Sequence, residues 1–260
     1  MRAARRHRRA LLGAARLVAL AGLLAAWEAG VRAGTIDPFY VSAPSAIVAR
    51  AVAWSASGYI LPHVAATLAV ALAGLVLGVV LGAAVGGAVA AWPWAQRAVL
   101  PVLAAGNAVP RLILYPLLVV WLGFGPLARI VLVVTLVFFT AAFNTHAAVR
   151  ALDRDVVWTA RLLGARRGQL LWHVYLPAVG VWLLGTIRIT MGFALAGAIV
   201  GEYIGATRGV GMVVAFAQSM FNARDVFAGL CILLAIIWAL DAALRALEGL
   251  AARWRPTEVI

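Results

Sequence analysis

A stretch rich in charged residues, Arg150 to Pro177, interrupts the apolar runs that make up most of this 260-residue chain. An aspartate there, Asp153 or Asp155, can cap a helix, because its carboxylate accepts hydrogen bonds from the free N–H groups of the first turn. The charged residues of the stretch are Arg150, Asp153, Arg154, Asp155, Arg161, Arg166 and Arg167. An ordered, half-apolar segment at this place favours docking of a soluble partner. The alternative is an ordinary basic loop that obeys the positive-inside rule.

The same stretch predicts two short helices. Val156, Ala160 and Leu163 recur at helical spacing, and Gly164 suits the left-handed turn that ends the first helix. The second helix is expected from about residue 168 to residue 176, because a proline at position 177 disfavours helix just before it. The apolar face around Ala160 and Leu163 would then be the contact that a partner buries.

Four further charged residues lie inside apolar runs long enough to cross a bilayer: Arg111, Arg188, Glu202 and Asp241. Charges at such depth are costly and usually face a cavity or a partner. One hypothesis is that these residues line a solute pathway, where Arg111 and Arg188 would favour an anionic solute. The alternative is that Arg188 pairs with Glu202 or Asp241, or that the side chains lie near the interfaces and snorkel.

Catalytic motifs are missing from the sequence. It contains no His-Glu-x-x-His, no Gly-x-Ser-x-Gly and no Cys/His cluster with metal-ligand spacing, so a membrane enzyme is poorly supported. All 22 basic residues are arginine, and a Walker A phosphate loop needs a lysine. Cys231 is the single cysteine. We therefore expect no cofactor, no metal and no ATP bound by this chain.

The composition is that of an all-α membrane protein. The chain is 65% hydrophobic and 12% charged, with a mean hydropathy of +1.00. The net charge of +13 gathers at the presumed cytoplasmic ends of the apolar runs, so we interpret it as a determinant of topology and expect no nucleic-acid partner.

Six spans can position these residues. We expect them at about 10–33, 64–91, 99–122, 127–149, 178–204 and 226–247. The predicted organisation is a cytoplasmic N-terminus with the first span (1–33), an extracytoplasmic loop with a short helix (34–63), a five-helix core (64–250) that contains the charged loop 150–177, and a cytoplasmic tail (251–260). The short helix would run from Ser45 to about Ser55, capped by Ser42 or Ser45. A cleaved signal peptide is the alternative for the N-terminus, but its apolar stretch is longer than usual.

Small residues are spaced for close helix packing in two of the spans. Gly74, Gly78, Gly82 and Gly86 recur every fourth residue, and Gly197, Gly201 and Gly205 do the same later in the chain. Glycines in such a stripe let another backbone approach closely. The sequence predicts a close helix contact at each stripe and leaves open whether the contact is within the chain or with a partner.

Arginine placement indicates the orientation. With six spans and a cytoplasmic N-terminus, most arginines lie on the cytoplasmic side, as the positive-inside rule requires. The arginines that fall outside are Arg32, Arg50, Arg129, Arg208 and Arg224. Both termini and the 150–177 loop are therefore expected in the cytoplasm.

The charged loop also resembles a known signature. Ala160, three residues, Gly164, nine residues and then Val174-Tyr175-Leu176-Pro177 are similar to the cytoplasmic loop of ABC importer permeases, which reads Glu-Ala-Ala, three residues, Gly, nine residues, Ile, any residue, Leu-Pro. Two positions depart from it, since Trp158 stands where Glu is usual and Thr159 replaces the first Ala. The segments Val41–His63, Val109–Gly125 and Ile187–Gly211 resemble the same family, the first of them its sulfonate, taurine and nitrate branch.

This resemblance covers nearly everything after residue 35 and implies a six-helix type I importer permease in a bacterial inner membrane. It implies cytoplasmic ATPase subunits that carry ATP and Mg, an extracytoplasmic solute-binding protein, and a second permease subunit, in a homodimer. The loop residues Trp158, Thr159, Ala160, Leu163, Gly164, Val174, Leu176 and Pro177 would dock in the ATPase. The solute would be a small anion such as a sulfonate, taurine or nitrate, or alternatively a thiamine-pyrimidine or riboflavin-type vitamin precursor. A secondary transporter is the other class considered, but it would usually show an internal repeat, and we see none.

Overall fold

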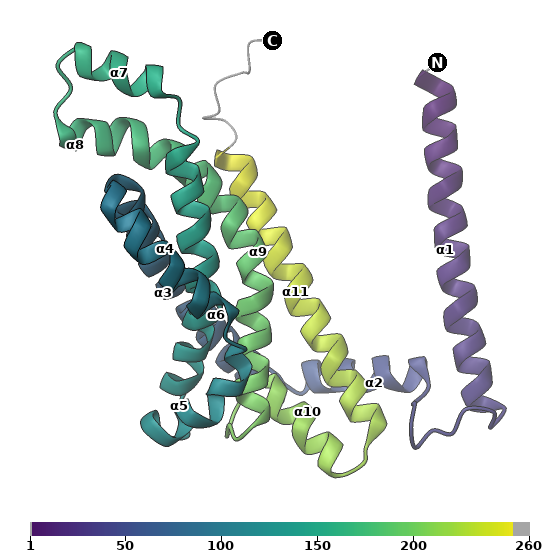
Figure 1. The fold of residues 1–260 in the computed structure, drawn as a ribbon. Coiled ribbons are helices and arrows are strands. Elements are labelled where there is room, and N and C mark those ends of the chain that lie inside the picture. The colour runs from purple at the N-terminus through teal and green to yellow at the C-terminus, as the bar shows by residue number, and fades with distance from the viewer. Residues whose placement is uncertain (1, 252–260) are drawn as a thin grey trace. The chain divides into compact units, whose positions relative to one another are not determined.

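The computed structural model describes residues 2–251, and this part of the chain is helical without strands (Figure 1). The helices are α1 (Arg2–Arg32), α2 (Pro44–Ala56), α3 (Leu61–Ala91), α4 (Pro93–Ala108), α5 (Tyr115–Leu122), α6 (Pro126–Arg150), α7 (Arg154–Leu162), α8 (Arg167–Leu170), α9 (Leu176–Tyr203), α10 (Val210–Ser219) and α11 (Ala223–Ala251). A 3₁₀ turn, Arg111–Leu114, precedes α5, and a π-helical turn, Leu171–Tyr175, joins α8 to α9. These elements form an all-α membrane fold, as the sequence predicts.

Contacts divide the chain into two compact units. The larger one comprises Pro62–Met212 and the part of α11 from Ala235, and the smaller one comprises the chain up to Leu61 together with Val213–Leu234. Each unit is described by itself. In both, prolines mark where helices begin: α2, α4, α5 and α6 carry a proline at the first or second position. A proline there loses no hydrogen bond and already has the helical φ angle.

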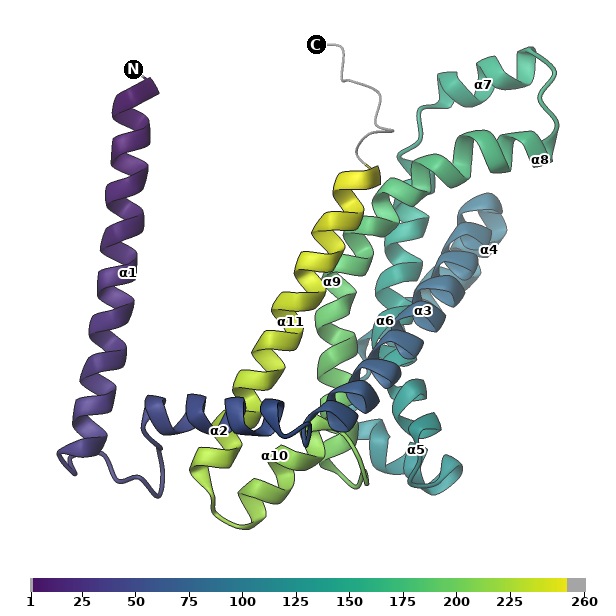
Figure 2. The ribbon, with the colours of Figure 1, turned by 180° about the vertical axis from the view of Figure 1, so that it is seen from behind.

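In the larger unit, α6 and α9 pack side by side along their length (Figures 1 and 2). A Cβ atom on Gly201 would lie against the side chain of Arg129, one on Gly197 would meet Leu136, and Asn144 donates to Thr186. Along these contacts the residue numbers rise in α6 and fall in α9, so the two helices are antiparallel. The second predicted glycine stripe thus packs within the chain.

The first glycine stripe packs α3 against α6. A Cβ atom on Gly78 would approach Cβ of Val137 to 2.7 Å, and one on Gly82 would approach the carbonyl oxygen of Phe138 to 2.5 Å. Gly74 faces Val133 in the same way, and Gly86 faces the backbone of Ala142. Residue numbers rise together along the two helices, so α3 and α6 are parallel.

The third span, expected at about 99–122, is broken by a bend. Helix α4 ends at Ala108, Val109 is extended, and the following segment is bent from α4 by 79°. Pro110 explains the break, because its ring pushes the preceding residue out of the helical region. Since α3 and α6 run parallel, residues 93–122 must return the chain to the end where α3 began. The bent pair therefore serves as one crossing.

The number of spans agrees with this topology. Among the described residues, five helices are long and apolar enough to cross a membrane, and six when the bent pair is one span. The five are Gly13–Arg32, Leu61–Ala91, Pro126–Arg150, Trp182–Tyr203 and Ala223–Ala246. The segment between the fifth and sixth spans, expected to be a loop as far as Asp225, contains the helix α10. With ten residues, α10 is too short to cross a bilayer.

In the smaller unit, α2 contacts both α1 and the start of α11. The short helix predicted from Ser45 runs from Pro44, but its N-cap residue is Ala43, and no side chain caps it. The prediction of a cap by Ser42 or Ser45 is therefore wrong. Ser45 instead donates from its N–H and its hydroxyl to the carboxylate of Glu28 in α1, at 3.0 and 2.7 Å. At the other side of α2, Arg50 pairs with Asp225.

Candidate functional sites

The first candidate site is the helical hairpin formed by α7 and α8, which stands at the end of the α6–α9 pair where α6 ends and α9 begins (Figure 1). Asp153 caps α7, since its Oδ1 accepts from the N–H of Asp155 at 2.9 Å. At the other end Gly164 has φ +84°, its N–H donates to Arg161, and the N–H of Ala165 donates to Ala160. This pair of bonds is the Schellman motif, so the helix ends at the glycine for the reason that its sequence predicts.

The second arm of the hairpin corrects the prediction of a helix that stops before Pro177. Helix α8 continues through a π-helical turn, Leu171–Tyr175, directly into α9, and the residues before the proline keep helical angles. The wider turn accommodates the proline ring and its missing N–H, which a regular α-helix would not. As a result, the hairpin and the long helix α9 form one continuous helical element.

The hairpin exposes apolar side chains. Leu162 and Leu163 are each 83% exposed, and Trp158 is 61% exposed. Val156, Leu171 and Trp172 are exposed as well, as is Thr159. Between the two arms lies a groove of about 340 Å³ lined by Ala160, Leu163, Gly164, Ala165, Gln169, Leu170, His173 and Val174. A smaller cavity of about 170 Å³ at the base of α7 is lined by Trp158 with Ala90, Val149, Arg150, Leu152, Val157 and Tyr175.

The charges inside the apolar runs do not gather at one place. Arg188 donates to Asp241 at 3.2 Å, and Arg245 also contacts this carboxylate, at 2.6 Å. This is one of the two pairings that the sequence left open. Arg111 lies elsewhere, since it donates to the backbone and side-chain oxygens of Asn107, and its guanidinium stands 4.8 Å from the ring centre of Phe139.

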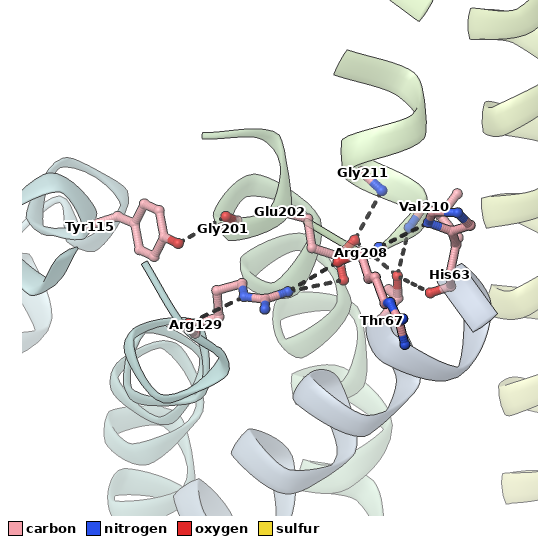
Figure 3. Close-up of polar contacts among 11 residues, drawn as sticks. His63, Thr67, Tyr115, Arg129, Gly201, Glu202, Arg208, Val210 and Gly211 are labelled. Atoms are coloured by element: carbon pink, nitrogen blue, oxygen red, sulfur yellow. Dashed lines mark hydrogen bonds and ion pairs between the residues drawn. The ribbon is translucent and has the colours of Figure 1, made fainter. Parts of the chain in front are cut away.

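Glu202 is fully buried and lies apart from the other three predicted charges, in a polar cluster (Figure 3). Its Oε2 accepts from the hydroxyl of Thr67 and from the N–H of Gly211, both at 2.9 Å. The Thr67 hydroxyl in turn accepts from the N–H of Val210 at 3.0 Å, and Nδ1 of His63 accepts from the N–H of Gly209 at 3.2 Å. Side chains of α3 and α9 thus bind three successive N–H groups where α10 begins.

Arg129 completes this cluster from α6. Its Nη1 lies 3.9 Å from Oε1 of Glu202 and donates to the carbonyl of Arg208 at 3.4 Å. The hydroxyl of Tyr115 in α5 donates to the carbonyl of Gly201 at 2.9 Å. A buried carboxylate is tolerated only when it is paired and hydrogen bonded, and Arg129 supplies the opposite charge. We refer to His63, Thr67, Tyr115, Arg129, Gly201, Glu202 and Gly209–Gly211 as the Glu202 cluster.

Glycines make room for this carboxylate. A Cβ atom on Gly209 would meet the carboxyl group of Glu202, and one on Gly211 would lie 2.6 Å from the carbonyl of Ile199 and 2.9 Å from Cβ of Glu202. The sequence reasoning identified Glu202 and missed the other side chains of the cluster. The place of Arg129 near the start of an apolar run is a signal that could have found it, because it is a further charge within a span.

Residues 78–252 match the family described as binding-protein-dependent transport system inner membrane component. The match extends over more than half of the chain and includes both the hairpin and Glu202. The chain belongs to this family. It is a permease subunit of an ABC importer.

Curated relatives of the permease transport different solutes. It is 35% identical to the riboflavin transport system permease protein RibX of Chloroflexus aurantiacus, over 91% of this chain and 88% of that protein. The formylaminopyrimidine transport permease protein ThiX of Halalkalibacterium halodurans is 30% identical, over 90% and 92%. The taurine transport system permease protein TauC of Escherichia coli is 29% identical, over 90% and 87%.

A solved structure shares the fold of the permease. An inward-facing form of the MetNI methionine ABC transporter contains a chain that matches with a TM-score of 0.66 and 21% identity, over 74% of this chain and 95% of that chain. This likeness supports the type I importer fold. Among the described residues of the permease, no three His, Cys, Asp or Glu side chains gather where they could hold a metal ion.

Proposed function

We propose that the α7–α8 hairpin docks into a cytoplasmic ABC ATPase, so that ATP hydrolysis by that partner drives uptake of a small solute through the permease. One observation carries the proposal. The hairpin is ordered by a cap at Asp153 and a glycine turn at Gly164, and yet it leaves Trp158, Leu162 and Leu163 more than half exposed. Ordered apolar side chains on a projecting element are typical of an interface that a partner buries.

Trp158 is the anchor that we propose for this interface. It stands where the family signature has a glutamate, so the contact is apolar at this point, and tryptophans are over-represented among residues that carry binding energy. Thr159, Ala160, Leu163 and Gly164 would complete the contact from α7. Val174, Leu176 and Pro177 would hold the second arm in place. ATP and Mg would reside on the ATPase, and the permease itself would carry no catalytic site.

The assembly that we propose follows the family. It contains two ATPase subunits, an extracytoplasmic solute-binding protein and a second permease subunit, a copy of this chain. The hairpin and both termini would lie in the cytoplasm, because most arginines gather there under the positive-inside rule. Closure of the ATPase pair would move the hairpins and switch the permease between inward-open and outward-open states.

Two solute classes are candidates. A sulfonate, taurine or nitrate is favoured by the arginines within the spans, Arg111 and Arg188, and by relatives such as TauC. A vitamin precursor of the riboflavin or thiamine-pyrimidine type is favoured by the relatives RibX and ThiX. Uptake of radiolabelled taurine and riboflavin into proteoliposomes that contain the permease, its ATPase and its solute-binding protein separates the two classes.

Co-purification of the ATPase with Gly164→Asp tests the docking role. Gly164 has φ +84° and open space around it, so the aspartate clashes with nothing but strains the backbone by about 1 kcal/mol and adds a charge at the groove. We expect the wild type to retain the ATPase and the variant to lose at least about tenfold in affinity.

Gly168→Asp is the matched control. Gly168 also has open space around it, but its φ is not left-handed, so the same charge enters the hairpin without backbone strain. We expect this variant to keep the ATPase. If the wild-type permease binds no ATPase, the hairpin is a plain basic loop and the proposal fails.

A further inference from the structure

Two long helices connect the hairpin to the Glu202 cluster. Helix α6 carries Arg129 in its first turn and leads into the hairpin at Arg150, whereas α9 leaves the hairpin at Leu176 and carries Glu202 as its penultimate residue. The 28 residues of α9 extend about 42 Å at 1.5 Å per residue. The same two helices therefore meet the hairpin at one end and the cluster at the other.

The cluster joins the far ends of these helices to two further elements. Arg129 and Glu202 face each other across the α6–α9 pair, and Thr67 connects the carboxylate to α3 (Figure 3). The N–H of Gly211 connects the carboxylate directly to the first turn of α10, and the N–H of Val210 connects to it through the Thr67 hydroxyl. Four elements thus depend on one buried carboxylate. A displacement of α6 or α9 that keeps these contacts must carry the start of α10 with it.

The geometry points to Glu202, Arg129 and Thr67 as positioning residues that transmit movement of the hairpin to α10 at the opposite end of the helix pair. This role rests on the proposed docking of the ATPase at the hairpin. Helix α10 is apolar and too short to cross a bilayer, and it follows a loop that bends at Gly205 and Gly209, both with positive φ. Such a short helix moves as a unit when its first turn is held, and the cluster holds that turn.

Packing alone does not account for the cluster. A buried ion pair is expensive, and apolar residues of similar volume often stabilise a core equally well. What the polar groups supply is direction, because each N–H of Gly209, Val210 and Gly211 has one defined acceptor: His63, Thr67 and Glu202 in turn. Directional bonds transmit a displacement of α3 or α9 to α10 in a way that a sliding apolar contact does not.

Solute transported per ATP hydrolysed tests this role in proteoliposomes that contain the permease, its ATPase and its binding protein. The variants are Thr67→Val, Glu202→Gln and Glu202→Leu. We expect Thr67→Val and Glu202→Leu to lower the ratio by about tenfold or more, since each removes a buried hydrogen bond at the start of α10. Glu202→Gln keeps an oxygen that can accept from Thr67 and Gly211, and it should retain most of the coupling.

Thr190→Val is the matched control for Thr67→Val. Both threonines are 0% exposed, but the Thr190 hydroxyl donates within its own helix, to Thr186 at 2.8 Å. We expect the control to transport normally. Hydrogen–deuterium exchange at residues 209–211 supplies a readout independent of transport, and it should speed up about tenfold or more in Thr67→Val and Glu202→Leu only.

Three outcomes overturn the inference. Normal coupling in Glu202→Leu and Thr67→Val removes the proposed role. A fall in assembled complex that accounts for the whole loss of transport makes the cluster a packing element only. A wild-type permease that transports without any ATPase refutes the proposed function itself, and this result is separate from the first two because it appears before any variant is made.

Discussion

Arg50 and Asp225 form the best-defined ion pair of the smaller unit. Nε and Nη2 of the arginine donate to the two carboxylate oxygens, each at 2.9 Å, and these hydrogen bonds to Asp225 raise the pKa of Arg50. The guanidinium also stands 5.1 Å from the ring centre of Trp54. Bidentate pairs of this kind have a fixed geometry, so the pair sets the position of α2 against the start of α11.

Breaking this pair should lower stability. We expect Asp225→Asn to reduce the free energy of unfolding by about 1 to 2 kcal/mol, because the carboxylate is nearly buried while the arginine remains partly solvated. Thermal unfolding of the purified permease in detergent measures the change. The reversed pair, Arg50→Asp with Asp225→Arg, should recover part of the loss; equal losses in the single and reversed variants would show that the pairing contributes nothing.

At the scale of the element, the stripe of glycines on α3 determines how closely α6 approaches. Gly86 lies against the backbone of Ala142, whereas the neighbouring Gly87 has its closest neighbour, the methyl group of Thr145, at 4.0 Å from a Cβ position. In lipid the hydrophobic effect contributes little to helix association. The close van der Waals contacts along this stripe stabilise the helix pair instead. A side chain at position 87 therefore has room, whereas one at position 86 would clash with α6.

Gly86→Ala and Gly87→Ala form a matched pair of variants. We expect Gly86→Ala to destabilise the permease by about 1 to 3 kcal/mol through overpacking against a backbone that cannot move aside. Gly87→Ala should be neutral or stabilising by up to about 1 kcal/mol, because alanine favours helix over glycine. The melting temperatures in detergent decide; similar losses at both positions would contradict a contact confined to the stripe.

In the hairpin and the helices near it, some features can be predicted from the local sequence and others depend on tertiary packing. The Asp153 cap and the Gly164 turn follow from local hydrogen bonding, which a sequence encodes directly. The continuous helix through Pro177 and the break at Pro110 do not follow, since proline permits a wider turn in one place and a bend in the other. Packing against neighbouring helices decides which of these geometries forms, and the local sequence does not determine where those helices lie.

At the scale of the whole molecule, we propose that Arg188 bears on the choice of solute. It lies within a span and contacts Asp241, which Arg245 also contacts. If Arg188 lines the pathway, Arg188→Ala should lower uptake of an anionic solute by about tenfold or more while the assembled complex stays near normal in amount.

The outcome depends on comparing uptake with assembly. Quantitative immunoblotting of the purified complex gives the amount assembled, and labelled taurine gives the uptake. Arg188→Lys keeps the charge and should retain more uptake than alanine does. A loss of assembly equal to the loss of uptake would instead identify Arg188 as a structural partner of Asp241.

The sequence by itself determined the class of the protein, the positions of most spans, the hairpin with its cap and glycine turn, and the two stripes of close packing. These depend on hydropathy, helical period and local bonding, all of which act over a few residues. Only the tertiary structure decided that the stripes pack against α6, that the third span is broken, and that Glu202 meets Thr67, Arg129 and Gly211 rather than Arg188. Those contacts join residues far apart in the chain, and a buried carboxylate takes whichever donors the folded helices bring to it.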